Sequence, residues 1–176
     1  MIYDQVSEIQ VFQGIDKRKI ICLDTETTGF SPREDEILQL SIMNGCGDIL
    51  FDEYVKPQRK AEWPCAQAVH GISPEMVGNN NSIEMYQEKI NQILAGAELC
   101  VGYNLSFDLN FLRGAGVCIP EKLKIHDVMW AFSKITGKRR SLSYCAAYYG
   151  YSFQAHDSLE DAKATLHCFF AMNKLI

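Results

Sequence analysis

Two carboxylates, Asp24 and Glu26, follow an apolar run in the segment KIICLDTETTGF, residues 19–30. The apolar run is typical of a β-strand, in which alternate side chains leave the same face. Both acids would then point the same way, with Cα atoms about 6.6 Å apart from the rise per residue. This spacing suits the binding of metal ions, although an acidic strand end before a loop has the same composition.

Two more acids stand where the sequence predicts the start of a helix. Asp108 lies in the first turn of a helix expected from about residue 106 to 113, and Asp161 lies in the first turn of the last helix. Asp157 and Glu160 have the spacing of a capping box at the start of that last helix. A carboxylate is favoured near a helix N-terminus by electrostatics alone, so neither acid is decisive when taken singly.

Two histidines are placed where they would join such a site. His156 comes just before the last helix, so it and Asp161 would be presented at the same helix start. His70 lies in the long connection 56–80, and connections of this length in a compact domain are usually functional. Composition alone equally allows each histidine to be a solvated or structural loop residue.

The elements that must position these residues follow an α/β pattern. Apolar runs and alternation predict three consecutive antiparallel strands, then helices and two further short strands. The strands are expected from residue 20 and at 37–44, 49–55, 99–103 and 123–125. The helices are expected at 81–96, with a capping box of Asn81 and Glu84, and at 106–113, 127–137, 141–150 and from 157.

The length of 176 residues suits one domain, which we place at 19–176 after an N-terminal segment, 1–18, with no assigned chemistry. The hydrophobic share of 47% and the charged share of 22% are those of an ordinary globular protein. The sequence has no apolar run of membrane-spanning length, and its first ten residues carry acids where a signal peptide would be basic. We therefore expect a cytoplasmic protein without a membrane partner.

The seven cysteines are an odd number and include no C-x-x-C pair. Several lie in apolar runs, which favours buried, reduced thiols over a zinc site or disulfides. The net charge of −5 argues against a protein that holds nucleic acid by bulk charge. A polyanion would have to be held by local groups or by bound metal. The basic triplet at 138–140 would be an ordinary solvated loop or a phosphate contact.

Three separate strings resemble the exonuclease motifs of the DEDDh family, the DnaQ-like 3′-5′ exonucleases that include epsilon-type proofreading exonucleases of bacterial DNA polymerase III. The strings are LDTETTG at 23–29, VGYNLSFDLNFL at 101–112 and AHDSLEDA at 155–162, and VHGIS at 69–73 is similar to a loop beside the nucleotide. The resemblance covers about residues 19–170. It implies an RNase H-like fold, with a mixed five-stranded sheet, three antiparallel strands first, flanked by helices.

Carried over residue by residue, the resemblance implies that Asp24, Glu26, Asp108 and Asp161 hold two divalent cations, Mg²⁺ or Mn²⁺, with His156 as the general base. The nucleotide-contacting positions of the family match Thr27, Thr28, Gly29, Phe30, Ala66, His70, Asn104 and Phe107.

The resemblance also implies a function. We expect a metal-dependent 3′-5′ exonuclease that releases nucleoside 5′-monophosphates from single-stranded or frayed 3′ ends, with DNA favoured over RNA and a DNA polymerase subunit as a candidate partner. The alternatives are a 3′-5′ exoribonuclease and a catalytically silent binding module of a polymerase assembly, and the complete set of five residues argues against the silent module. One departure, Gln39 in the second strand, replaces an acid frequent in relatives, and we expect little effect from it.

Overall fold

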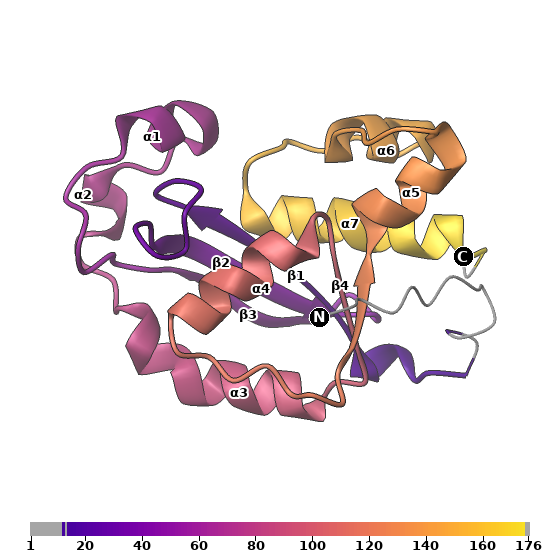
Figure 1. The fold of residues 1–176 in the computed structure, drawn as a ribbon, viewed down its shortest axis with the longest axis horizontal. Helices are drawn as coiled ribbons and strands as arrows, with labels where there is room; N and C mark the ends of the chain where they lie inside the picture. Colours follow the sequence, from indigo (N-terminus) through magenta and orange to yellow (C-terminus); the bar gives the residue numbers. More distant parts are fainter. Residues whose placement is uncertain (1–11, 13, 175–176) are drawn as a thin grey trace.

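The computed structural model describes residue 12 and residues 14–174, and its centre is one mixed sheet of five strands in the order β3-β2-β1-β4-β5 (Figure 1). The strands are β1 Ile20–Thr27, β2 Ile37–Asn44, β3 Ile49–Tyr54, β4 Leu99–Gly102 and β5 Lys124–Asp127. β1, β2 and β3 pair antiparallel, whereas β4 and β5 run parallel to β1. The predicted sheet, with its three antiparallel strands first, is confirmed.

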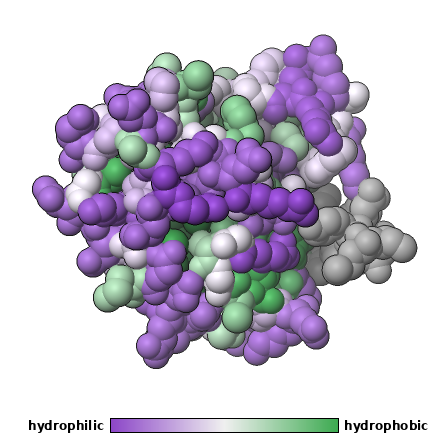
Figure 2. Space-filling model, turned by 60° about the vertical axis from the view of Figure 1, so that its left-hand side comes forward, coloured by the Kyte–Doolittle hydropathy of each residue, from purple (hydrophilic) through white to green (hydrophobic). Residues whose placement is uncertain are grey.

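Helices cover both faces of the sheet (Figure 1). The elements are η2 Lys17–Lys19, α1 Pro64–His70, α2 Pro74–Val77, η3 Ile83–Tyr86, α3 Gln87–Gly96, α4 Leu105–Gly114, α5 Val128–Thr136, α6 Leu142–Tyr148 and α7 Ser158–Met172. Among the described residues, no helix combines the length and the apolar character needed to cross a membrane. Figure 2 shows the side toward which α1 and α2 project, where hydrophilic side chains predominate and hydrophobic ones form small separate patches.

The alternation of β1 divides the hydrophobic core in two. Ile21 and Leu23 pack into a cluster with residues of α3 and α4, whereas Ile20 and Cys22 pack into a cluster with residues of α5, α6 and α7. Because the side-chain period of a strand is two, the even-numbered positions that follow Cys22 continue toward α7. The sequence of β1 therefore decides which layer of helices its terminal side chains meet.

Two helices start where the sequence predicts, after a residue that caps them. Asp127 accepts hydrogen bonds from Met129 N and Trp130 N at the start of α5, and Ser141 accepts one from Tyr144 N at the start of α6. These bonds satisfy backbone donors that have no partner inside the helix.

The segment 81–96 differs from its prediction. It begins with the 3₁₀ turn η3, whose N-cap is Ser82, and the expected capping box of Asn81 and Glu84 is not formed. The Asn81 side chain instead donates a hydrogen bond to the Tyr86 hydroxyl, 3.3 Å away. The connection 56–80 also contains α1 and α2, each begun by a proline at its first position.

Phe12, in the expected N-terminal segment, enters the core, and Ile15 packs against the same cluster. The Phe12 ring is buried against the rings of His126 and Phe169, with centroids 4.9 and 5.2 Å away. The other residues of that segment up to residue 13 lie outside the described residues, and η2 follows at Lys17–Lys19. The hydrophobic core thus extends beyond the start expected for the domain at residue 19.

Candidate active site

Glu26, His156 and Asp161 converge at one end of the sheet. Each contributes one ligand-type atom, and these atoms all lie within 4.8 Å of one another. Glu26 reaches this point from the α7-facing side of β1, and Asp161 reaches it from the first turn of α7. His156 precedes the N-cap residue of α7 and has a left-handed backbone, with φ of 72°. The predicted grouping of the histidine with these two acids is therefore present.

Asp108 comes to the same edge from the other layer of helices. It lies in the first turn of α4, which follows the parallel strand β4, and it is only 3% exposed. Its Oδ1 accepts hydrogen bonds from Thr25 N at 3.0 Å and from Thr25 Oγ1 at 2.7 Å. Thr25 faces α4 because it is the odd-numbered residue between two acids that face α7. Asp108 is thereby held against the end of β1.

The four carboxyl groups perturb one another. Burial, with the charges of Asp108, Asp161 and Glu26, raises the pKa of Asp24 well above its usual range. Burial and the neighbouring acids raise the pKa of Glu26 to about 8. Burial raises the pKa of Asp108 to about 7 and that of Asp161 to about 6. Four ionised carboxylates in this place would repel one another, so a bound cation would be strongly favoured.

The donor set fits a hard divalent cation. Asp161 Oδ2 accepts a hydrogen bond from His156 N at 3.2 Å, whereas its Oδ1 is buried and has no hydrogen-bond partner among the described residues. A buried carboxylate oxygen without a donor is costly unless a cation completes its coordination. Oxygen ligands select ions such as Mg²⁺ or Mn²⁺ over softer metals. Asp24, Glu26, Asp108 and Asp161 would hold such ions, as the resemblance to the DEDDh family implies.

The raised pKa values predict how the metal-free protein responds to pH. An acid whose pKa is higher in the folded than in the unfolded chain adds stability at low pH, and this stability is lost as the pH rises through the folded value. Asp108 and Glu26 lose their protons in the folded protein between about pH 6.5 and about pH 8.5. His126, whose pKa burial lowers to about 4, is neutral throughout this range, so it does not change the stability there. We expect the melting temperature in EDTA to fall by roughly 5 °C or more across this range.

Thermal unfolding followed by circular dichroism measures this fall. Millimolar Mg²⁺ should remove most of it, because cations bound to the folded state compensate the carboxylates. A melting temperature that is flat in EDTA over the same range would contradict the assigned electrostatics.

The turn after β1 is fixed by internal hydrogen bonds. Thr27 Oγ1 donates to the carbonyl of Gly29 at 2.6 Å, and Thr28 Oγ1 contacts Asp35 and accepts from Glu36 N. These hydroxyls are thus engaged within the protein, and their contact with a nucleotide stays a prediction. Phe30, in contrast, is 89% exposed at the tip of the turn.

The other predicted nucleotide contacts lie around this turn. The Phe107 ring, on α4, has its centroid 6.5 Å from that of Phe30. Asn104 is the N-cap of α4, with a left-handed backbone and an exposed side chain that makes no capping bond. Ala66, on α1, is half-buried against a small cluster of hydrophobic residues that includes Trp63. Phe30 and Phe107 therefore offer an aromatic surface at the site.

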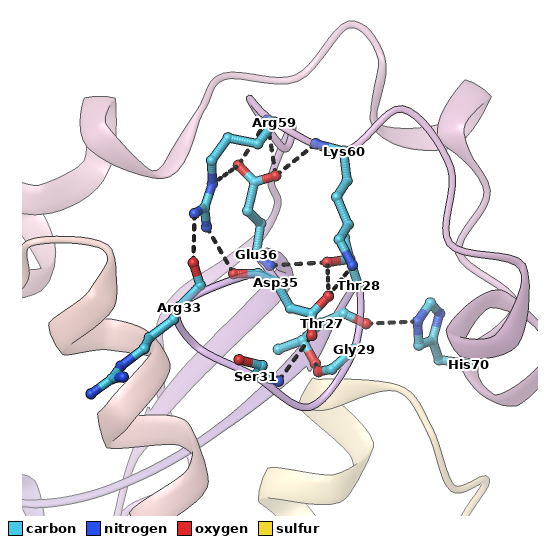
Figure 3. A network of polar contacts seen from close by, with 10 residues as sticks. All are labelled: Thr27, Thr28, Gly29, Ser31, Arg33, Asp35, Glu36, Arg59, Lys60 and His70. Atoms are coloured by element: carbon cyan, nitrogen blue, oxygen red, sulfur yellow. Dashed lines mark hydrogen bonds and ion pairs between the residues drawn. The ribbon is translucent and has the colours of Figure 1, made fainter.

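A polar network joins the loop after β1 to the connection that follows β3 (Figure 3). The buried carboxylate of Asp35 accepts hydrogen bonds from Ser31 N and from Lys60 Nζ, with which it also forms an ion pair. Glu36 accepts bonds from the backbone N–H groups of residues 58–60, and the Arg59 guanidinium donates to the carbonyls of residues 33 and 35. The connection 56–63 is therefore locked onto the loop that follows β1.

His70 joins α1 to the same turn (Figure 3). Its Nδ1 accepts a hydrogen bond from Ile72 N at 3.0 Å, which leaves Nε2 as the donor to the carbonyl of Thr27 at 3.2 Å. Burial lowers the pKa of His70, which favours this neutral ring. His70 thus holds α1 beside the turn, and its predicted nucleotide contact is not tested by this geometry.

Gln39 has a larger role than the sequence led us to expect. Its Nε2 donates to Asp157 Oδ2 and its Oε1 accepts from Ser158 N, both at 3.3 Å. Gln39 lies directly opposite Glu26 in the pairing of β1 with β2. It therefore fixes the start of α7, which presents His156 and Asp161. The period of two along β2 could have revealed that Gln39 faces the site.

Gly29 is packed directly against this network. A Cβ at Gly29 would lie 2.5 Å from Asp35 Oδ2, so one of the two must move. We expect Gly29→Ala to reduce the free energy of unfolding by about 1–3 kcal/mol, measured by urea titration. Gly96→Ala is the matched control, because a Cβ there meets nothing within 4 Å. Equal stability of the two variants would refute this tight packing.

A mixed sheet that brings acids and a histidine to the carboxyl end of its central strands has the donor groups that a metal-dependent nuclease would need. Residues 21–169 match the RNase_T family model, described as Exonuclease, and the chain belongs to this family. The predicted DnaQ-like family and exonuclease class are confirmed.

The relatives include proteins named for RNA and for DNA. RNA exonuclease 4 of Aspergillus fumigatus is 32% identical over 158 residues, which cover 84% of this chain and 49% of that protein. The PolC-type DNA polymerase III of Thermotoga maritima is 31% identical over 159 residues, which cover 85% of this chain and 11% of that protein. The chain spans about half the length of the RNA exonuclease 4 proteins of Aspergillus fumigatus and Gibberella zeae.

The solved structures confirm the predicted RNase H-like fold. An Escherichia coli exonuclease I complex with single-stranded DNA superposes with a TM-score of 0.75 at 17% identity. The superposition covers 89% of this chain and 40% of exonuclease I.

Proposed function

We propose that this chain is a metal-dependent 3′-5′ exonuclease that removes nucleoside 5′-monophosphates from single-stranded or frayed 3′ ends. The observation that carries the proposal is the convergence of Glu26, Asp161 and His156, with Asp24 and Asp108 beside them, in a chain of the exonuclease family. These residues come from β1, α4 and α7, and the fold brings them to one place. A catalytically silent module would not need this complete set.

The residues divide the work of phosphodiester hydrolysis. Two bound divalent cations would neutralise charge on the phosphate and make a nearby water more acidic. The four carboxylates would hold these ions, and Gln39 would fix the start of α7 that carries Asp161. His156, exposed on the loop before α7, would accept the proton of the attacking water. An imidazole is suited to this role near neutral pH.

The site also accounts for nucleic acid binding by an acidic chain. Cations held at the carboxylates would reverse the local charge and attract the terminal phosphate. Phe30 and Phe107 would stack on the terminal bases, a contact that accepts any base and favours unpaired ends. We expect faster digestion of single-stranded or frayed 3′ ends than of blunt duplex ends.

The sugar preference has two candidates. The sequence favours DNA through its epsilon-type motifs, and the relatives include a PolC-type polymerase, which keeps a DNA polymerase subunit as a candidate partner. RNA exonuclease 4 proteins of several fungi and of Homo sapiens support an exoribonuclease as the second candidate. Both candidates use the same phosphate chemistry and differ only in the treatment of the 2′-hydroxyl.

A side-by-side digestion tests the proposal. DNA and RNA oligomers labelled at the 5′ or the 3′ end are incubated with Mg²⁺, with EDTA, or with the Asp24→Ala variant and Mg²⁺. We expect the 5′-labelled oligomers to give a ladder of products shortened from the 3′ end only when the wild type acts with Mg²⁺. The oligomer that is digested faster, DNA or RNA, identifies the preferred sugar. Intact 3′ ends with both Mg²⁺ and Mn²⁺ would overturn the proposed activity.

A further inference from the structure

The part of the chain between Asp127 and Asp157 differs in charge from the rest. Residues 128–156 contain no Asp or Glu, although the whole chain has a net charge of −5. The cations of this segment are Lys134, Lys138, Arg139 and Arg140, on α5 and on the connection to α6. Among the described residues, none of the four forms an ion pair with a carboxylate. The segment is therefore a basic region on an acidic protein.

Exposed aromatic rings accompany these cations. The Arg139 guanidinium lies 4.0 Å from the centroid of the Trp130 ring, and that of Arg140 lies 4.4 Å from the centroid of Tyr144. Trp130, Tyr144 and Tyr148 are exposed, and the other large aromatic side chain exposed in the described part of the chain is Phe30. Stacking holds each guanidinium in place while its N–H groups remain able to bind phosphate.

Arg140 adds a second sign of a missing partner. Its Nε is buried and has no hydrogen-bond partner in the part of the chain that the structure describes, although the Arg140 carbonyl accepts a bond from the Tyr103 hydroxyl at 2.8 Å. A charged donor without an acceptor is costly inside a protein. Because Nε is closed to solvent in this conformation, a phosphate oxygen could become its acceptor only if the Arg140 side chain shifts.

The basic region adjoins the candidate active site. Strands β1, β4 and β5 are parallel, so α5, which follows β5, starts at the edge where the acids gather. Asn104 N donates to Asp127 Oδ1 at 3.1 Å, which joins the starts of α4 and α5. After α6 the chain returns to α7 through the loop that carries His156, and α5 and α6 lie together above α7 (Figure 1). A single-stranded nucleic acid whose 3′ end enters the site could therefore continue over this region.

We propose that the surface formed by Trp130, Lys134, Lys138, Arg139, Arg140 and Tyr144 binds the part of a single-stranded nucleic acid that lies 5′ of the terminal nucleotides. Lysine and arginine would contact phosphates, and the stacked Arg–aromatic pairs would support bases without selecting them. This proposal rests on the proposed function, because it places the 3′ end of the nucleic acid in the active site and the nucleotides on its 5′ side over the basic surface. It explains how an acidic chain holds more than the last nucleotides.

Binding tests the surface directly. Fluorescence anisotropy measures the Kd of labelled single-stranded oligomers for the slow His156→Ala variant with Mg²⁺, using a short oligomer that fills only the site and a longer one. In that background, Lys138→Gln with Arg139→Gln should weaken binding of the longer oligomer by roughly tenfold and leave the short one unchanged. The slope of log K against log salt should fall in magnitude by about 0.7 for each phosphate that the variant no longer neutralises.

A matched control is available at the opposite end of β5. Lys122→Gln with Lys124→Gln removes the same charge from two exposed lysines that precede or begin that strand. Trp130→Leu tests stacking, because it should weaken binding of the longer oligomer without changing the salt slope. Equal losses of affinity in the two double variants, or equal losses for short and longer oligomers, would overturn the proposal. Binding of polyglutamate as tight as that of the longer oligomer would overturn it in favour of an acidic protein partner.

A small substrate separates this proposal from the proposed function. The p-nitrophenyl ester of thymidine 5′-monophosphate reports hydrolysis at the site without any strand. If the wild type cleaves neither this ester nor the oligomers, yet the longer oligomer binds through Arg139, the surface stands and the exonuclease proposal falls. If both are cleaved and the Lys138/Arg139 variant binds the longer oligomer as the wild type does, the surface proposal alone falls.

Discussion

Asp24→Asn is expected to reduce the rate of 3′-end hydrolysis by roughly a thousandfold or more, the largest effect of a single isosteric change in this chain. Asp24 lies between the other acids, and the charges of Asp108, Asp161 and Glu26 all act on it. An amide keeps the shape of the side chain but removes the charge that would hold cations. Release of nucleotides from a 5′-labelled oligomer with Mg²⁺ measures the reduction in rate.

The same change should stabilise the protein when metal is absent. Removing one of four mutually repelling carboxylates raises the melting temperature in EDTA near pH 8 and reduces the further gain from Mg²⁺. Asp52→Asn, on the edge strand β3, is the control, because within the described residues the side chain of that exposed acid accepts a hydrogen bond from the Ser41 hydroxyl alone. An Asp24→Asn variant with wild-type turnover would remove the carboxylate cluster from the mechanism.

His156→Ala is expected to lower kcat by about a hundredfold to ten-thousandfold, the range for loss of a general base. The His156 side chain is exposed, and its ring lies near Asp161 without a hydrogen bond in the described part of the chain, whereas its backbone N–H donates to Asp161 Oδ2. Its removal should therefore leave the stabilisation by Mg²⁺ and the KM within about threefold of the wild type. Steady-state kinetics on a short oligomer and thermal unfolding with and without Mg²⁺ distinguish the two effects.

A second histidine provides the control for this result. His167, on α7, has its Nε2 3.1 Å from the carbonyl of Tyr149 and stacks on Tyr151, so His167→Gln should leave kcat unchanged. Near wild-type turnover of His156→Ala at neutral pH would exclude His156 as the base. A loss of Mg²⁺ stabilisation equal to that of Asp24→Asn would instead identify His156 as a metal ligand.

Local sequence rules predicted much of this site. The period of two placed Asp24 and Glu26 on one face of β1, the helix expected from about residue 106 placed Asp108 in its first turn, and a capping signal at Asp157 placed Asp161 in the first turn of α7. These rules depend only on neighbours in the chain, so they hold before the tertiary structure is known. That the three segments meet was inferred from the resemblance to a family, because no local rule brings β1, α4 and α7 together.

The residues that fix the site were harder to find. The bonds from Gln39 to the start of α7 and from Lys60 to Asp35 join segments far apart in the sequence. Such pairs depend on strand order and loop path, which composition does not report. Likewise, the threonines that look available for a ligand have hydroxyls already bonded within the turn, a result of tertiary structure that the motif cannot show.

The hydrogen bonds of Thr25 have a consequence for how the two layers of helices share the coordination of an ion. Two donors from Thr25 already saturate one oxygen of Asp108, so the fold presets this carboxylate and leaves its other oxygen for an incoming ligand. Asp161 has the opposite condition, with one buried oxygen still without a donor. The α4 half of the site is thus preorganised by the protein, whereas the α7 half needs a bound cation to satisfy its free carboxylate oxygen.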